Sequence, residues 1–320
     1  MTPATPRYYP HGIVTLDAEY QRPGLAAVHL IVEQGRAAII DTGTNSAVPH
    51  VLAALAGLGI APEGVDYVIV THVHLDHAGA AGALLAACPH AKLVVHPRGA
   101  PHMIDPTKLV QGVKAVYGEA AFEQFYGEIV PAPAERVIAA DVLGSAGYTL
   151  DFNGRRLDFF DTPGHARHHY GIHDLASNSL FTGDTFGISY REFDVDGVPF
   201  IFPTTTPVQF EPDALHASID RLIARNAAAA YLTHYGRIEN LPALAPTLHA
   251  LIDEFVALAL AAAGPARQEA LQQAMYDLLL ARLRAHGCKL DDTTCRALLA
   301  NDVELNCQGL LFWRDRASRA

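Results

Sequence analysis

A run of metal-binding side chains, the His-x-His-x-Asp-His motif at residues 72–77, is the part of this 320-residue sequence best suited to chemistry. The motif directly follows a continuous apolar strand, so its side chains crowd at a strand end. Imidazoles and a carboxylate placed there each need a partner, because burying unpartnered polar groups costs free energy. A metal ion supplies that partner. In a tight loop, His72 and His74 can converge on one ion, while Asp76 and His77 turn towards a second.

Three more residues of metal-ligand type follow other predicted strands, in the order His, Asp, His. His165 ends a Thr-Pro-Gly-His run, Asp184 ends Phe-Thr-Gly-Asp, and His234 ends Tyr-Leu-Thr-His. Each places one ligand in a loop at the edge of a sheet, so we expect the remaining metal ligands among these three residues.

Taken together, these motifs resemble those of the metallo-β-lactamase superfamily, in particular its glyoxalase II-like and lactonase-like branch. The resemblance covers roughly residues 12–240. It implies two divalent metal ions, the first held by His72, His74 and His165, the second by Asp76, His77 and His234, with Asp184 as the bridge. Imidazole and carboxylate ligands without thiolate suit zinc first, with iron(II) or manganese as alternatives.

Further residues are candidates for supporting roles. Asp41 matches a family position at which a carboxylate accepts a proton from a ligand imidazole and fixes its tautomer; alternatively it starts a turn or caps the next helix. His169 falls where some family members also have histidine, and we expect it to pack or to support the ligands. Asp76 is also a candidate for stabilising the departing group. Tyr190 and Tyr235 could hydrogen-bond a substrate carbonyl, or could be aromatic packing.

The elements that must position these residues alternate strand and helix in two similar halves, followed by helices only. The expected class is α/β, a four-layer αβ/βα sandwich. Residues 1–240 form the expected catalytic domain, with a helical insertion or lid at 98–145, and residues 241–320 form an α-helical extension. Strands are expected in hairpins at 26–41 and around 153–154, and at 65–70, 92–96, 156–161, 169–174, 179–181 and 229–233; helices at 47–59, 78–87, 212–225, 245–263, 266–286 and 293–300.

Composition excludes several classes of protein. Lys and Arg number 23 against 34 Asp and Glu, a net charge of −11 that repels a nucleic-acid backbone. The N-terminal residues do not resemble a secretory signal, and the longest strongly apolar stretch, 255–263, is too short to cross a bilayer. Four cysteines without a Cys-x-x-Cys pair are expected as free thiols. We therefore expect a cytoplasmic protein with a small-molecule substrate, and leave a homodimer open.

The reaction implied is hydrolysis, in which a metal-bridging hydroxide attacks the carbonyl of an ester, thioester or lactone. Neither a Gly-x-Ser-x-Gly elbow nor a P-loop supplies a competing mechanism. Three alternatives stay open: a mononuclear iron oxidoreductase resembling persulfide dioxygenases, a β-lactamase-like hydrolase of lactams, and a ligand-binding regulatory protein with residual hydrolysis.

Overall fold

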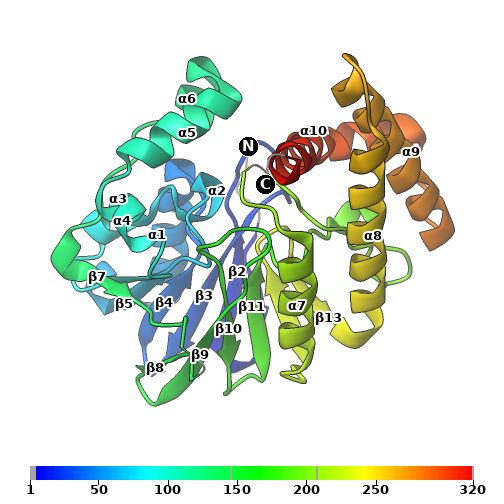
Figure 1. Cartoon of the computed structure of the whole chain (residues 1–320). Helices are drawn as coiled ribbons and strands as arrows, with labels where there is room; N and C mark the ends of the chain where they lie inside the picture. Colours follow the sequence, from blue (N-terminus) through cyan, green and yellow to red (C-terminus); the bar gives the residue numbers. More distant parts are fainter. Residues whose placement is uncertain (1–4, 145, 207, 319–320) are drawn as a thin grey trace. The chain divides into compact units, whose positions relative to one another are not determined.

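Two β-sheets carry the loops that hold the predicted ligands (Figure 1). The first has seven strands in chain order: β1 (Arg7–Tyr9), β2 (Ile13–Asp17), β3 (Ala27–Glu33), β4 (Arg36–Ile40), β5 (Val65–Ile69), β6 (Lys92–Val95) and β7 (Val137–Ala139). Strands β1 to β4 pair antiparallel, whereas β4 to β7 pair parallel. Because β4 and β5 run in the same direction, the residues that follow them, Asp41 and Thr71–His77, leave the same edge of the sheet.

The second sheet has six strands in the order β13-β12-β11-β10-β9-β8. Their bounds are β8 (Tyr148–Phe152), β9 (Arg155–Asp161), β10 (Tyr170–Asp174), β11 (Ser179–Gly183), β12 (Ala229–Leu232) and β13 (Gly236–Glu239). All neighbours are antiparallel except β11 and β12. The carboxyl ends of this parallel pair therefore lead into Asp184 and into Thr233-His234.

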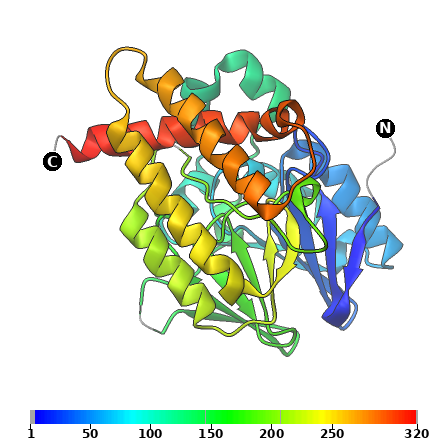
Figure 2. The ribbon, with the colours of Figure 1, turned by 90° about the vertical axis from the view of Figure 1, so that its right-hand side faces the viewer.

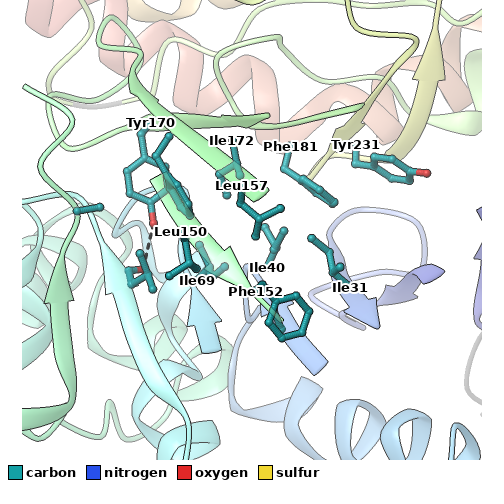
Figure 3. Packing of buried hydrophobic residues seen from close by; sticks show 14 of the residues in the cluster. Ile31, Ile40, Ile69, Leu150, Phe152, Leu157, Tyr170, Ile172, Phe181 and Tyr231 are labelled. Carbon is teal, nitrogen blue, oxygen red and sulfur yellow. Dashed lines mark hydrogen bonds between the residues drawn. The ribbon is translucent and has the colours of Figure 1, made fainter. Parts of the chain in front are cut away.

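Buried apolar side chains of both sheets pack into one core (Figure 3). Ile40 and Ile69 come from the first sheet, and Leu157, Ile172 and Phe181 come from the second. These side chains are almost wholly buried, and each stabilises the fold by roughly 1.5–3 kcal/mol through removal of apolar surface from water. The core thus fixes the edges of the two sheets that carry the candidate site.

The computed structural model describes residues 5–144, 146–206 and 208–318. Its chain divides into a first unit of Met1–Asp161, His168–Gly183 and Ala227–Glu239, which contains both sheets, and a second unit of Thr162–Arg167, Asp184–Asn226 and Asn240–Ala320. The final change of unit, between Glu239 and Asn240, lies one residue before the predicted boundary between residues 240 and 241. Residues 184–226, which we assigned to the catalytic domain, group with the C-terminal helices. Position 145 of the predicted insertion and the chain ends lie outside the described residues.

The helices of the first unit are α1 (Val48–Gly57), α2 (Leu75–Ala78), α3 (Ala81–Ala87), α4 (Ala100–Ile104), α5 (Thr107–Tyr117) and α6 (Glu119–Phe125). The helix predicted at 78–87 is confirmed over residues 81–87 as α3, whereas residues 79 and 80 separate it from α2. The predicted insertion contains helices α4 to α6 but ends in a strand, β7, that pairs with β6. Strands β1, β2, β7 and β13 were missed because they are three to five residues long and lack a distinctive apolar pattern.

Four helices dominate the second unit: α7 (Pro212–Ile223), α8 (Leu241–Ala261), α9 (Arg267–His286) and α10 (Asp292–Ala317), the last three seen in yellow, orange and red in Figure 2. The prediction that the last helix ends at residue 300 is wrong. The polar residues Asp302 and Asn306 interrupt its apolar pattern, yet both are buried. Asp302 accepts a hydrogen bond from the Tyr190 hydroxyl, and the Asn306 side-chain oxygen accepts one from the Thr205 N–H. Because these hydrogen bonds satisfy the buried polar groups of Asp302 and Asn306, the helix can continue through both residues to Ala317.

Helix α8 is long and apolar enough, by length and composition, to cross a membrane. The strongly apolar stretch at 255–263, expected to be too short to cross a bilayer, overlaps only the last seven residues of this helix. In the structure the helix packs against α7, α9 and α10, and much of its apolar face is buried within the second unit.

The four cysteines, Cys88, Cys288, Cys295 and Cys307, are buried free thiols, as predicted. Burial raises the pKa of the Cys307 thiol to about 12 and that of Cys88 to about 11. Both therefore remain protonated at neutral pH, which makes them poor nucleophiles and poor metal ligands.

We predict that buried His29 makes the protein sensitive to acid. Burial lowers its pKa from 6.5 to about 4, against smaller opposing effects of the Leu232 carbonyl and Asp41. Below pH 6.5, His29 binds a proton in the unfolded chain but not in the folded chain. The free energy of unfolding therefore falls between pH 6.5 and pH 4, by at most roughly 3 kcal/mol. Urea unfolding across this range should show a smaller loss for His29→Gln than for the wild type. An equal loss of unfolding free energy with falling pH in His29→Gln and the wild type would contradict the prediction. The matched control is His90→Gln, at an exposed position.

Candidate metal centre

A wholly buried carboxylate, that of Asp41, organises the first unit's part of the site. It accepts hydrogen bonds from the Thr71 N–H at 2.7 Å, the Thr71 hydroxyl at 2.9 and 3.0 Å, the Thr233 hydroxyl at 2.6 Å and His77 Nδ1 at 2.8 Å. Asp41 itself has left-handed backbone torsions, with φ of 53°, a conformation that aspartate tolerates better than most residues. It therefore joins the ends of β4, β5 and β12.

Asp76, His77 and His234 offer ligand atoms that all lie within 4.8 Å of one another. Asp76 Oδ2 is 3.2 Å from His234 Nε2 and 3.7 Å from His77 Nε2. The Nδ1 atoms of both rings form other hydrogen bonds: His77 Nδ1 with Asp41, and His234 Nδ1 with the Leu25 carbonyl at 2.7 Å. Since Nδ1 must donate to these oxygens, each neutral ring presents an Nε2 lone pair towards Asp76.

That donor set fits a divalent metal ion. Two imidazole lone pairs and one carboxylate oxygen converge, and a cation between three acceptors converts their mutual repulsion into attraction. Nitrogen and oxygen donors of this kind suit zinc, iron(II) or manganese. Asp76 is only 23% exposed and both histidines are more deeply buried, so an ion held there would be partly shielded from water.

His72 and His74 lie beside this group in the same loop. The Nε2 atom of His72 is 2.8 Å from Nδ1 of His74. His169 stacks on His72, with ring centroids 4.8 Å apart, and His168 accepts a hydrogen bond from the Val73 N–H at 3.5 Å. His169 thus contacts a predicted ligand.

The second unit contains the other two predicted ligands, next to each other. His165 Nε2 lies 3.3 Å from Asp184 Oδ2, and both residues are buried. The Nδ1 atom of His165 donates to the Thr204 carbonyl at 3.3 Å, which again leaves Nε2 as the nitrogen facing a carboxylate. Within each unit, therefore, the predicted ligands come together.

The two candidate tyrosines have different surroundings. Tyr190 is buried in the second unit, and its hydroxyl donates to both oxygens of Asp302 at 3.1 and 3.0 Å. Tyr235 follows His234 directly in the first unit. Burial, followed by the negative charge of Asp17, raises its pKa to about 12, so its phenol remains a hydrogen-bond donor at neutral pH.

Sequence reasoning missed four contributors to the site. Thr71 and Thr233 each precede a predicted ligand, and the repeated Thr-His pair after a strand was the signal that could have revealed them. Gly183 has φ of 46°, and a Cβ there would lie 2.6 Å from both His169 Nε2 and Thr71 Oγ1. The fourth contributor is the backbone carbonyl of Leu25, which leaves no signal in the sequence.

Comparisons with known proteins agree with this architecture. A family model described as the metallo-beta-lactamase superfamily matches residues 22–234. The metallo-beta-lactamase fold-containing protein ST1585 of Sulfurisphaera tokodaii is 30% identical over 190 residues, 58% of this chain and 64% of its own length. The chain thus spans less than two thirds of this relative in sequence.

Solved structures share the fold over more of the chain. The crystal structure of ST1585 gives a TM-score of 0.58 at 22% identity, covering 94% of this chain and 98% of its own. TTHA1429 from Thermus thermophilus, a metallo-beta-lactamase family protein, gives 0.66 at 21% identity, covering 96% and 94%. The apo chemotaxis sensor ODP from T. denticola gives 0.52 at 15% identity, covering 77% and 93%, and a peroxy diiron species of this sensor also aligns. These likenesses confirm the predicted α/β sandwich with C-terminal helices.

We predict that Asp41→Asn weakens metal binding about 10–100-fold, the usual effect of removing the carboxylate that orients a ligand imidazole. The amide also directs an N–H at surrounding donors, which should cost about 1–3 kcal/mol of stability. Competition with a chromophoric chelator measures the metal affinity, and urea unfolding measures the stability. Exposed Asp151→Asn serves as the control. Wild-type metal affinity in a folded Asp41→Asn protein would show that Asp41 does not orient a ligand.

Proposed function

The chain belongs to the metallo-beta-lactamase superfamily, and from that premise we propose that it is a hydrolase of esters, thioesters or lactones that depends on two divalent metal ions. The observation that carries the proposal is the convergence of Asp76, His77 and His234. The Nδ1 atom of each imidazole is held by an oxygen. An arrangement that fixes both tautomers is characteristic of metal ligands.

The proposed ligand set extends this group by the family pattern. His72, His74 and His165 would hold one ion, Asp76, His77 and His234 the other, with Asp184 contributing to both. Zinc is the first candidate. Such ions, when bound, lower the pKa of water towards about 7 and polarise a carbonyl, which supplies a nucleophile and an electrophile for hydrolysis at neutral pH.

The chain's own residues perform the remaining tasks. Asp41 and the Leu25 carbonyl keep the His77 and His234 rings from rotating, so the ligands need no reorganisation when a substrate arrives. Tyr235 remains protonated at neutral pH, because burial raises its pKa to about 12. Its side chain also hydrogen-bonds Asp17, so donation to a substrate oxygen would require exchange of that partner. The hydroxyl of Tyr190 donates to Asp302, which favours a structural role for Tyr190 over substrate binding.

A second candidate function follows from one relative. Sensor ODP, which shares the fold, is described with a peroxy diiron species, and the histidine and carboxylate donors of this chain suit iron(II) as well as zinc. An iron-dependent oxidoreductase or sensor is therefore the alternative to the hydrolase. The two differ in resident metal and in oxygen consumption.

Metal analysis of protein purified without added metal tests the proposal, combined with assays on ester, thioester, lactone and β-lactam substrates. Two zinc ions per chain with turnover of a carbonyl ester, thioester or lactone would support the hydrolase. Iron with oxygen consumption would favour the alternative, and β-lactam turnover alone would reassign the substrate class. No turnover with zinc, manganese or iron would overturn the proposal.

We also predict that His234→Ala lowers the metal content by about one ion per chain and the hydrolytic kcat/KM by more than about 100-fold, since even the partners of metal ligands are worth roughly 10–100-fold. Elemental analysis and steady-state kinetics provide the two readouts. His90→Ala, at an exposed position outside the site, should leave both unchanged. Full metal content and activity in His234→Ala would remove His234 from the ligand set.

A further inference from the structure

A second group of histidines and carboxylates lies on the helical pair α7 and α8, entirely within the second unit. Each helix carries the pattern His-x-x-x-Asp: His216 and Asp220 on α7, and His249 and Asp253 on α8. Residues four apart lie on the same helix face, so each helix presents both side chains together. The two helices pack side by side (Figures 1 and 2), which brings the two patterns face to face.

The four side chains form a continuous chain of close contacts. His216 Nδ1 and His249 Nδ1 are 2.6 Å apart, with the ring centroids 4.9 Å apart and the ring planes at 12°, so the two rings meet edge to edge through these nitrogens. The outer nitrogens each face a carboxylate of the opposite helix: His216 Nε2 lies 3.1 Å from Asp253, and His249 Nε2 lies 3.2 Å from Asp220. The order in space is therefore Asp253, His216, His249, Asp220.

These contacts require a positive species between the two Nδ1 atoms. His216 Nε2 hydrogen-bonds Asp253, and His249 Nε2 faces the Asp220 carboxylate. With each ring proton on Nε2, beside its carboxylate, a lone pair is left on each neutral Nδ1. Two lone pairs 2.6 Å apart repel, so the pair is stable only with a shared proton or a metal cation between them. A carboxylate on the outer nitrogen of an imidazole is also the usual second partner of a metal-bound histidine.

We propose that His216 and His249 bind one transition-metal dication through their Nδ1 atoms, with Asp253 and Asp220 orienting the two rings. Imidazole nitrogen selects zinc, nickel or copper over magnesium and calcium. Two nitrogens bound at about 2.0–2.1 Å in tetrahedral geometry lie about 3.3 Å apart, so the rings need to separate by about 0.7 Å and to tilt until both lone pairs point at the ion. This site shares no residue with the candidate metal centre.

The exposure of the side chains suits such a site. His216 and His249 are 24% and 28% exposed, so an ion can enter and water can complete its coordination. Asp253 and Asp220 are 76% and 72% exposed, and their negative charge attracts cations to this surface. The backbone of both ligands is helical, which keeps the two imidazoles close before the metal binds and lowers the entropic cost of binding.

Equilibrium dialysis of the full-length protein against nickel or zinc, followed by elemental analysis, tests the proposal. The double variant His216→Ala/His249→Ala should bind about one ion per chain fewer than the wild type, whereas His90→Ala should bind the same number. Asp220→Asn/Asp253→Asn, which keeps both imidazoles and is the milder change, should weaken binding at this site about 10–100-fold. In the copper-loaded protein, the electron paramagnetic resonance signal assigned to this site should show two nitrogen ligands and should be absent from the double variant.

Equal metal content in the wild type and in a folded double variant would overturn the proposal, and would mean that the imidazoles share only a proton. If Asp220→Asn/Asp253→Asn bound the metal as tightly as the wild type does, the two carboxylates would have no part in the proposed site. The result is independent of the proposed hydrolase, because the missing ion is counted by difference and no substrate is used. Loss of hydrolysis in His234→Ala with the α7–α8 ion retained would likewise separate the two sites.

Discussion

A buried negative charge, the carboxylate of Asp41, is the constraint that joins fold and site in the first unit. A carboxylate removed from water is tolerated only if donors replace its hydration. Here the donors come from segments far apart in the sequence: Thr71 and His77 follow β5, and Thr233 follows β12. Satisfying one charge therefore fixes the ends of strands from both sheets. The same contact sets the orientation of an imidazole, so stability and ligand geometry depend on one group.

Three of the five predicted histidine ligands repeat one arrangement, which occurs in both units. In His77, His165 and His234, Nδ1 lies on an oxygen, either a carboxylate or a backbone carbonyl, and Nε2 faces a carboxylate. Hydrogen bonding at one nitrogen decides which nitrogen carries the lone pair. The tautomers are thereby set by the fold, before any ligand is bound. Such preorganisation is what separates a metal site from a polar surface that happens to contain histidines.

Buried polar residues also shape the second unit. Asp302 and Asn306 lie within α10, where an apolar face would be the simpler choice, and each is paired with a side chain or backbone group of residues 190–205. A Cβ at Gly309 would lie 1.6 Å from the Thr205 carbonyl, so only glycine permits the helix to approach this loop. In the sequence, polar residues at apolar positions indicate the end of a helix, which explains why the last predicted helix was too short.

The sequence by itself determined the types of the candidate ligands, their order and their placement after strands, because a cluster such as His72–His77 has few explanations other than a metal. It also indicated the two-sheet class, since strand and helix patterns depend on local side chains. Only the tertiary structure decided which atoms meet: that Thr71 and Thr233 share Asp41, that the Leu25 carbonyl orients His234, and that α10 continues past its polar residues. These contacts join residues up to 209 positions apart, several through backbone atoms that every residue has, so no local pattern encodes them.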